Sequence, residues 1–241
     1  MKLIVLRAGD AAAPVAARYG EFFSWIRREA GDGWTGEWLE HDLRSSDAPL
    51  PAPGDADGFI ITGSSSSVTE RAPWMLRSED LVRGIVEAGT PLFGICFGHQ
   101  MVAQALGGRV AKNPRGREIG TIDVRVIAHA PRDPILAGVG DRFRANHTHM
   151  DSVVELPEGA RVIAETDLEP NAAFVIGENV KCVQFHPEIN GDAMRGYVEA
   201  RAQLIEGEGG DPRAILQRVT DAPEGASTLR SFVRLVMGRR A

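Results

Sequence analysis

The chain has 241 residues, of which 43% are hydrophobic and 25% charged, and its formal net charge at pH 7 is −6. This composition is that of an ordinary globular protein, the length suits one α/β domain over residues 1–241, and the acidic balance argues against nucleic acid as a partner. No apolar run approaches the ~20 residues that a membrane-spanning helix needs, and the apolar stretch at the N-terminus is too short for a signal peptide.

Short apolar runs separated by helical patterns predict an α/β fold. Helices are expected over residues 11–30 and 73–88, where apolar residues recur at helical spacing, and residues 47–57 are a surface connection. Alternating strands and helices predict a mostly parallel sheet flanked by helices, and the crowding of the later strands predicts a short antiparallel excursion. The expected strands are residues 3–6, 59–61, 92–95, 122–127, 161–164, 172–176 and 181–185.

The last fifty residues predict a helical extension, 191–241, that follows a core of about residues 1–190. A helix is expected over residues 193–206, then a short helix capped by Asp211, and a last helix capped by Ser227. Their apolar faces must be buried, and we expect them to pack on the sheet of this same chain. The alternative is that part of the extension covers the site or meets a partner.

A cysteine occupies the turn between a predicted strand and a predicted helix. The turn contains Gly94, Cys96 and Gly98. It follows the apolar run at residues 91–93 and precedes a helix-like stretch at residues 101–106. A sharp turn of this kind strains its central residue, and small neighbours relieve the crowding, as in the G-x-S-x-G elbow of serine hydrolases. The helix start would also lower the pKa of the thiol. The alternative is a buried structural cysteine between two packing glycines.

A histidine and a glutamate follow the last predicted strand. Side chains two residues apart on a strand point to the same face, so His186 and Glu188 could lie together, with the carboxylate orienting the imidazole. A nucleophile, a base and a group that orients the base are the parts of a catalytic triad. The alternative is a surface pair beside a turn proline, but the presence of Cys96 in its elbow favours the triad.

The remaining cysteines, histidines and arginines give weaker indications of function. The two cysteines, Cys96 and Cys182, are expected to be free thiols of a reducing compartment, which predicts a cytoplasmic protein, with Cys182 in the core. His147 and His149 could ligate a metal with Asp151, but we expect none. The sequence contains no nucleotide-binding glycine motif, so no cofactor is expected. Arginines that could neutralise a substrate carboxylate are Arg115, Arg117 and Arg144, although solvated surface arginines are commoner.

These motifs resemble the class I glutamine amidotransferase family. Its G-x-C-x-G-x-Q signature is similar to residues 94–100, and its later F-H-P-E to residues 185–188. Residues 57–68 resemble the family's strand and oxyanion-hole loop, and residues 149–153 its S-H-x-D-x-V block. The resemblance implies a flavodoxin-like sheet. The residues after the cysteine are also similar to stand-alone GMP synthase-like members and to gamma-glutamyl peptidases.

The resemblance implies a role for individual residues. Cys96 would be the nucleophile, His186 the base and Glu188 its orienting group. The backbone N–H groups of Ser64 and Phe97 would form the oxyanion hole. The family loop reads Gly-Gly-Pro, whereas this chain has a serine at the second position, which contributes only its backbone. The implied substrate contacts are Gln100, Gly63 and His149.

The implied reaction is acyl transfer from the γ-amide of glutamine through a thioester, which releases glutamate and ammonia. A synthetase partner could receive that ammonia, although no S-G-G-x-D-S stretch of such a synthetase is present. One alternative is a γ-glutamyl peptidase that uses the same triad on a larger γ-glutamyl compound. A second alternative is a non-catalytic interaction protein with the same fold.

Overall fold

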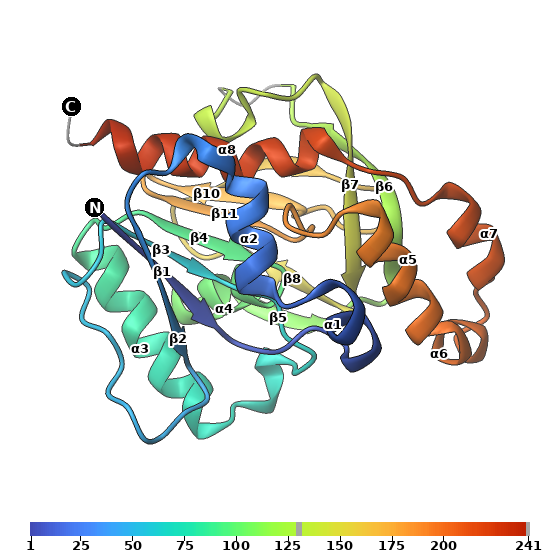
Figure 1. Cartoon of the computed structure of the whole chain (residues 1–241), viewed down its shortest axis with the longest axis horizontal. Helices are drawn as coiled ribbons and strands as arrows, with labels where there is room; N and C mark the ends of the chain where they lie inside the picture. Colours follow the sequence, from blue (N-terminus) through green and yellow to red (C-terminus); the bar gives the residue numbers. More distant parts are fainter. Residues whose placement is uncertain (129–131, 240–241) are drawn as a thin grey trace.

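A mixed sheet flanked by helices forms the centre of the protein in a computed structural model that describes residues 1–128 and 132–239 (Figure 1). The strand order is β2-β1-β3-β4-β11-β10-β9-β6-β7. The strands from β2 to β11 in this order run parallel, and those from β11 to β7 pair antiparallel. The strands are β1 Lys2–Arg7, β2 Glu37–Asp42, β3 Gly58–Ile61, β4 Leu92–Ile95, β6 Glu118–Val126, β7 Arg142–His149, β9 Ala160–Glu165, β10 Ala173–Ile176 and β11 Val180–Val183.

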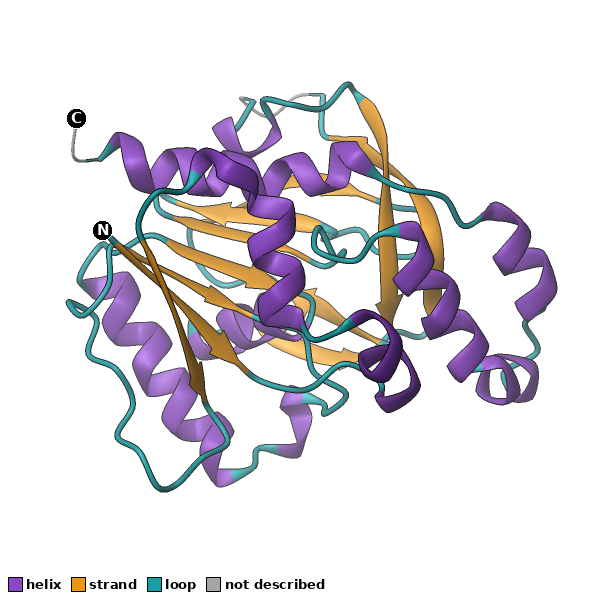
Figure 2. Ribbon diagram, viewed as in Figure 1, coloured by secondary structure: helices purple, strands orange, loops and turns teal. Residues whose placement is uncertain are grey.

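Two helical layers cover the sheet, as Figure 2 shows with α2 in front of the strands and α4 behind them. Alternate residues of β1 enter two separate hydrophobic clusters, because successive side chains of a strand point to opposite faces. One cluster is completed by α2 and α8, and the other by α3 and α4. The helices are α1 Ala13–Tyr19, α2 Phe22–Ala30, α3 Pro73–Glu87, α4 Phe97–Ala105, α5 Gly191–Ala200, α6 Ala202–Gly207, α7 Pro212–Arg218 and α8 Pro223–Gly238.

The expected fold class is confirmed, and the antiparallel part is longer than a short excursion. It includes β7, which the sequence did not predict because most of its side chains are polar although they are buried. The sequence also did not predict the half-exposed edge strand β2, or the separate pair of β5 Arg109–Lys112 and β8 Asp151–Glu155. The expected packing of the last helix on the chain's own sheet is confirmed by its apolar residues in the first cluster.

Three helix predictions need correction. The expected helix over 11–30 is two helices, because the chain turns at Gly20 with φ of 89°. The helix over 193–206 is interrupted at Arg201, which separates α5 from α6. Ser227 does not cap the last helix, which begins at Pro223, and its hydroxyl donates to the Glu224 carbonyl inside the helix. The cap at Asp211 is confirmed by its bonds from two N–H groups of α7.

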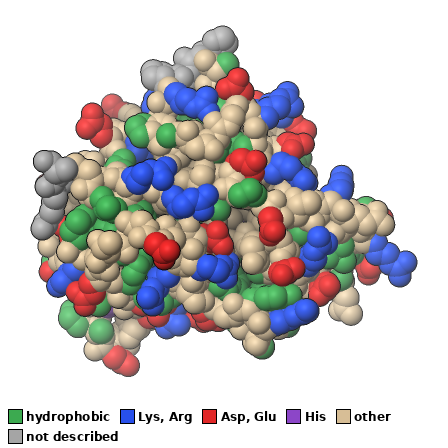
Figure 3. Space-filling model, turned by 45° about the horizontal axis from the view of Figure 1, so that its top comes forward, with side chains coloured by type: hydrophobic (Ala, Val, Ile, Leu, Met, Phe, Trp, Pro, Cys, Tyr) green, Lys and Arg blue, Asp and Glu red, His purple; other side chains and the backbone are tan. Residues whose placement is uncertain are grey.

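The sheet places the family motifs at one edge. The carboxyl ends of β3, β4 and β11, which are neighbouring parallel strands, lead to Gly63, Cys96 and His186. Ligands of open α/β sheets bind at this edge of the parallel strands. None of the described helices is long and apolar enough to cross a lipid bilayer. On the face drawn in Figure 3, cationic and anionic side chains are interspersed.

Candidate active site

Cys96 occupies a strained turn between β4 and α4. Its backbone has φ of 51° and ψ of −100°, a sparsely populated positive-φ conformation that costs about 1–3 kcal/mol in a non-glycine residue. The flanking glycines make the turn feasible. A Cβ atom on Gly94 would lie 2.7 Å from the Gly98 carbonyl oxygen, and one on Gly98 would lie 2.5 Å from the Ile61 carbonyl oxygen. The G-x-C-x-G motif is therefore required by close backbone contacts on both sides of the thiol.

His186 and Glu188 form a buried pair. The distance between His186 Nδ1 and Glu188 Oε1 is 2.7 Å, and neither residue is more than 4% exposed. The two side chains were expected to share one face of a strand. This expectation is wrong, because β11 ends at Val183 and the pair lies in the segment that follows it. Asn146 of β7 holds the segment instead. Its carbonyl accepts the His186 N–H at 2.8 Å, and its side-chain amide donates to the Ile189 carbonyl at 2.7 Å.

The thiol and the imidazole shift each other's pKa. Burial alone would raise the pKa of Cys96, but the close contact with His186, mainly its charge, and the charge of His149 together outweigh burial, so the pKa lies below the ordinary thiol value. Burial would lower the pKa of His186, and the charges of Glu188 and Cys96 raise it instead. The imidazole Nε2 makes no well-aligned hydrogen bond with the described residues, a frequent state of catalytic pairs without substrate. The site therefore favours a thiolate beside an imidazolium.

Two backbone N–H groups are available beside the thiol. Among the described residues, neither the Ser64 N–H nor the Phe97 N–H makes a hydrogen bond, and Phe97 is the first residue of α4. Gly63 lies against the imidazole of His186, since a Cβ atom there would be 2.8 Å from His186 Cε1. A side chain at position 63 would collide with the imidazole, which explains why this position is a glycine. Gln100 donates to the Asp151 carbonyl and to Gln184, so its amide nitrogen is engaged within the protein.

Two hollows meet at the site. The first has a volume of about 380 Å³ and is lined by Cys96, Phe97, Gln100 and His149 among others. The second has a volume of about 280 Å³ and is lined by His186 and Tyr197 among others. The wall that they share consists of Ser64, Ser65, Ser66, Thr148 and Arg201. A larger hollow of about 590 Å³ adjoins the first at Arg117 and Met150, but neither Cys96 nor His186 lines it.

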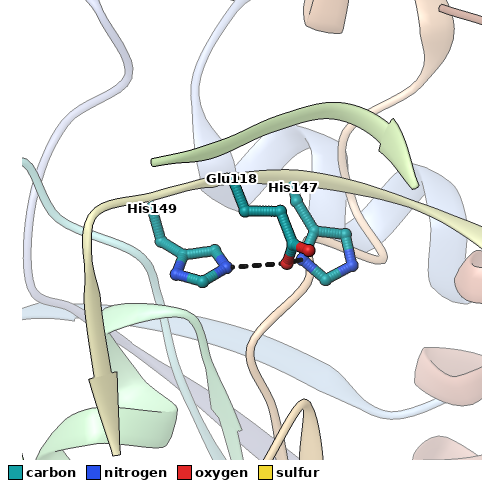
Figure 4. Close-up of side chains that lie close together, drawn as sticks. All are labelled: Glu118, His147 and His149. Atoms are coloured by element: carbon teal, nitrogen blue, oxygen red, sulfur yellow. Dashed lines mark hydrogen bonds and ion pairs between the residues drawn. The ribbon is translucent and has the colours of Figure 1, made fainter. Parts of the chain in front are cut away.

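A carboxylate lies between two imidazoles behind the first hollow (Figure 4). Glu118 Oε2 is 2.9 Å from His147 Nδ1 and 3.1 Å from His149 Nε2, and all three side chains are buried. These ligand atoms lie within 4.8 Å of one another, a spacing that a metal ion could bridge. Two members of the cluster are also bonded elsewhere, since Glu118 Oε1 accepts from Thr166 and His149 Nδ1 contacts the Asp151 carbonyl at 3.0 Å, whereas His147 Nε2 makes no hydrogen bond with the described residues. The cluster fixes the orientation of His149, which lines the first hollow together with Cys96.

Sequence reasoning missed several residues of this site. Glu118 had no assigned chemistry, and Asn146 and Thr148 lie on the strand that was not predicted. Arg201 fell within an expected helix, where an arginine is typical of a solvated face. Of the arginines that were considered for a substrate carboxylate, Arg117 lines the first hollow but is paired with Glu208 at 2.8 Å. Arg115 and Arg144 donate to backbone carbonyls, those of Asp167 and Arg218 respectively.

Comparison with known proteins identifies the family. The sequence model described as "Glutamine amidotransferase class-I" matches residues 37–201. "Gamma-glutamyl peptidase 4" of Arabidopsis thaliana is 30% identical over 186 residues, which cover 75% of this chain and 72% of that protein. A "GMP synthase [glutamine-hydrolyzing]" of Leifsonia xyli is 39% identical over 156 residues, or 64% of this chain. The match covers only 29% of that synthase.

Solved structures share the fold over almost the whole chain. A glutamine amidotransferase from Thermotoga maritima has a TM-score of 0.69 and 23% identity, and the match covers 99% of this chain and 97% of that one. A glutamine amido transferase from Methylobacillus flagellatus has a TM-score of 0.67 and 25% identity, with coverage of 99% and 92%.

Proposed function

The chain belongs to the class I glutamine amidotransferase family, a family of enzymes that act on amide bonds, and from this premise we propose that it hydrolyses γ-glutamyl amides through a thioester on Cys96. The observation that carries the proposal is the thiol at the strained elbow beside the buried His186–Glu188 pair. Glutamine is the smallest substrate of this class, and its products would be glutamate and ammonia.

The reaction proceeds in two halves. The Cys96 thiolate attacks the γ-carbonyl carbon, and the oxyanion accepts hydrogen bonds from the Ser64 and Phe97 N–H groups. The His186 imidazolium then gives its proton to the leaving nitrogen, the C–N bond breaks, and a γ-glutamyl thioester remains. In the second half His186 takes a proton from water, the hydroxide attacks the thioester, and glutamate leaves. Glu188 orients the imidazole throughout without transferring a proton.

The test is hydrolysis by the purified chain. Wild type should release glutamate and ammonia from glutamine, or glutamate and an amine from a γ-glutamyl peptide. Cys96→Ala should abolish turnover and also labelling by a glutamine-like electrophile, while thermal unfolding shows an intact fold. The matched control is Cys182→Ala, because Cys182 is buried in the second core cluster. Labelling that maps to Cys182 would refute the assignment of the nucleophile.

A peptidase is the second candidate, and the second hollow favours it. Ammonia needs the space of one water molecule, about 30 Å³, whereas the hollow on the His186 side has a volume of about 280 Å³. The gamma-glutamyl peptidase relative also matches this chain over most of its own length. Comparing kcat/KM for glutamine with that for a panel of γ-glutamyl peptides distinguishes the two candidates.

A synthetase that receives ammonia is the partner that the GMP synthase relatives suggest. A subunit that supplies ammonia to a partner is expected to be silent alone, whereas a stand-alone hydrolase is not. We expect measurable hydrolysis by the isolated chain. If the pure chain is inactive but gains glutaminase activity when a cell-extract fraction is added, the partner-dependent function is the correct one.

A further inference from the structure

Arg201 lies at the junction of the two hollows and is held there by neutral groups. It occupies the break between α5 and α6, so its side chain leaves the helix surface and reaches the site. One guanidinium nitrogen donates to the Thr148 hydroxyl at 2.6 Å, and the guanidinium carbon lies 4.9 Å from the centre of the Tyr197 ring. Tyr197 is itself fixed, because its hydroxyl accepts a bond from the Ala12 N–H. The guanidinium is therefore pre-positioned.

No carboxylate forms an ion pair with Arg201 within the part of the chain that the structure describes. The other arginines that line the two hollows are ion-paired: Arg44 with Asp10 and Asp42, and Arg117 with Glu208. Burial lowers the pKa of Arg201 and the charge of Arg117 adds to this effect, while the charges of Tyr197 and Cys96 act in the opposite direction without outweighing burial. A half-buried cation without a partner is costly unless a ligand supplies the opposite charge. Such a residue in a cleft is a candidate for ligand recognition.

The direction of proton transfer indicates which part of the substrate lies near Arg201. In the proposed reaction, the acyl group lies beside Cys96 in the first hollow, and the leaving nitrogen must face His186, which lines the second. The second hollow contains an ion pair between Asp10 and Arg44, and His186 is paired with Glu188. Among its described lining residues, only Arg201 carries an uncompensated charge. Arg201 also lines the first hollow, but on the side of the second it faces the leaving group, which can therefore neutralise it.

We propose that Arg201 binds a carboxylate of the leaving group, so that the preferred substrates are γ-glutamyl compounds whose amine part is an amino acid or peptide with a free carboxylate. This inference rests on the proposed γ-glutamyl hydrolysis and names its substrate class. A guanidinium suits the task because its planar N–H groups match the two oxygens of a carboxylate. Arg201 is a specificity-determining residue in this scheme, while the chemistry remains with Cys96 and His186.

The experiment compares γ-glutamylglycine with γ-glutamylglycinamide, which share the acyl group and differ in the charge of the leaving group. Wild type should have a kcat/KM that is roughly 10- to 100-fold higher for the acid, the range expected for a hydrogen-bonded charge pair. Arg201→Met should bring this ratio close to one. Arg201→Lys should give an intermediate ratio, because lysine keeps the charge but not the planar fork. The control is Arg213→Met, which removes an exposed charge on α7 and should keep the wild-type ratio.

Two outcomes would overturn the inference: a wild type that does not distinguish the acid from the amide, or equal losses for both substrates in Arg201→Met. Equal losses would assign Arg201 to the γ-glutamyl part or to the fold. If Arg201→Met does not fold, the ratio of kcat/KM for the acid to that for the amide, measured in wild type and in Arg201→Lys, still tests the inference. Failure of the proposed function has a different signature, namely no hydrolysis of glutamine or of either dipeptide by wild type and no electrophile labelling of Cys96.

Discussion

At the scale of single residues, the surroundings of Cys96 lower the pKa of a buried thiol, which is what the proposed nucleophile requires. Cys96 is only 4% exposed, and burial alone would keep its thiol protonated. The charge of His186 and the start of α4 act in the opposite direction. Cys182 shows the contrast, because burial raises the pKa of that thiol and no charged imidazole opposes the effect. The same residue type thus has a depressed pKa at one position and a raised pKa in the core at the other.

This difference predicts a pH profile. A depressed pKa keeps the thiolate populated at lower pH, so alkylation of Cys96 by a small electrophile should reach half its maximal rate at a pH below the ordinary thiol value of about 8.5. In His186→Ala the opposing charge is lost and burial remains, so the midpoint should move to higher pH. The rate of adduct formation at Cys96, followed by mass spectrometry across pH, measures both midpoints. An identical midpoint in wild type and variant would contradict the ion-pair interpretation.

The buried carboxylate predicts a second effect. Glu188→Gln keeps the size of the side chain but removes the charge and changes the tautomer that His186 Nδ1 favours. The kcat should fall by roughly 10²–10⁴-fold, the usual range for loss of an acid–base contribution. The loss should remain smaller than in Cys96→Ala. Steady-state rates with glutamine or a γ-glutamyl peptide check this, and wild-type activity in the variant would show that Glu188 has no catalytic part.

At the scale of elements, the loop after β3 departs from the family pattern and still offers the same backbone donor. The Ser64 hydroxyl accepts from the Ser66 N–H at 3.2 Å, so the side chain serves the loop. The loop is also tightly enclosed, because a Cβ atom on Gly9 would lie 2.6 Å from Ser64 Cα. These contacts hold the loop in place of the glycine and proline that the family usually has.

Substitutions at this loop separate backbone from side chain. Ser64→Gly should retain most activity, because it keeps the N–H donor. Ser64→Pro deletes that donor and should lower kcat by roughly 10²–10³-fold, the usual effect of losing one oxyanion-hole contact. Circular dichroism and thermal unfolding report whether the proline variant is folded. A comparable loss in Ser64→Gly would instead mean that the hydroxyl takes part in catalysis.

The sequence predicted those elements whose pattern is local. The strands that lead to Gly63, Cys96 and His186 are short apolar runs, and the elbow glycines follow from the turn itself. The sequence could not predict β7, because His147, Thr148 and His149 are buried by pairing with groups distant in sequence. It also could not predict that Arg201 interrupts a helix and faces the site, since that depends on Tyr197 and Thr148.

At the scale of the whole molecule, the C-terminal helix is part of the main core. The Phe232 ring of α8 stacks on Phe93 of β4 with 5.2 Å between the ring centres, and both side chains are fully buried. Phe93 lies on the strand that ends at the nucleophile elbow. A segment more than a hundred residues downstream therefore supports the strand that positions Cys96.

This packing predicts that the helix stabilises the entire chain. Phe232→Ala should lower the free energy of unfolding by about 3–5 kcal/mol, the usual cost of removing a buried phenylalanine from a close-packed core. The matched control is Met237→Ala on the same helix, where the side chain is 36% exposed and the loss should stay within about 0.5 kcal/mol. Urea unfolding followed by circular dichroism gives both values. Because β4 carries the elbow, loss of folded structure and loss of Cys96 labelling in Phe232→Ala should have the same urea midpoint. Two separate midpoints would show that the C-terminal helix and the site unfold as independent units.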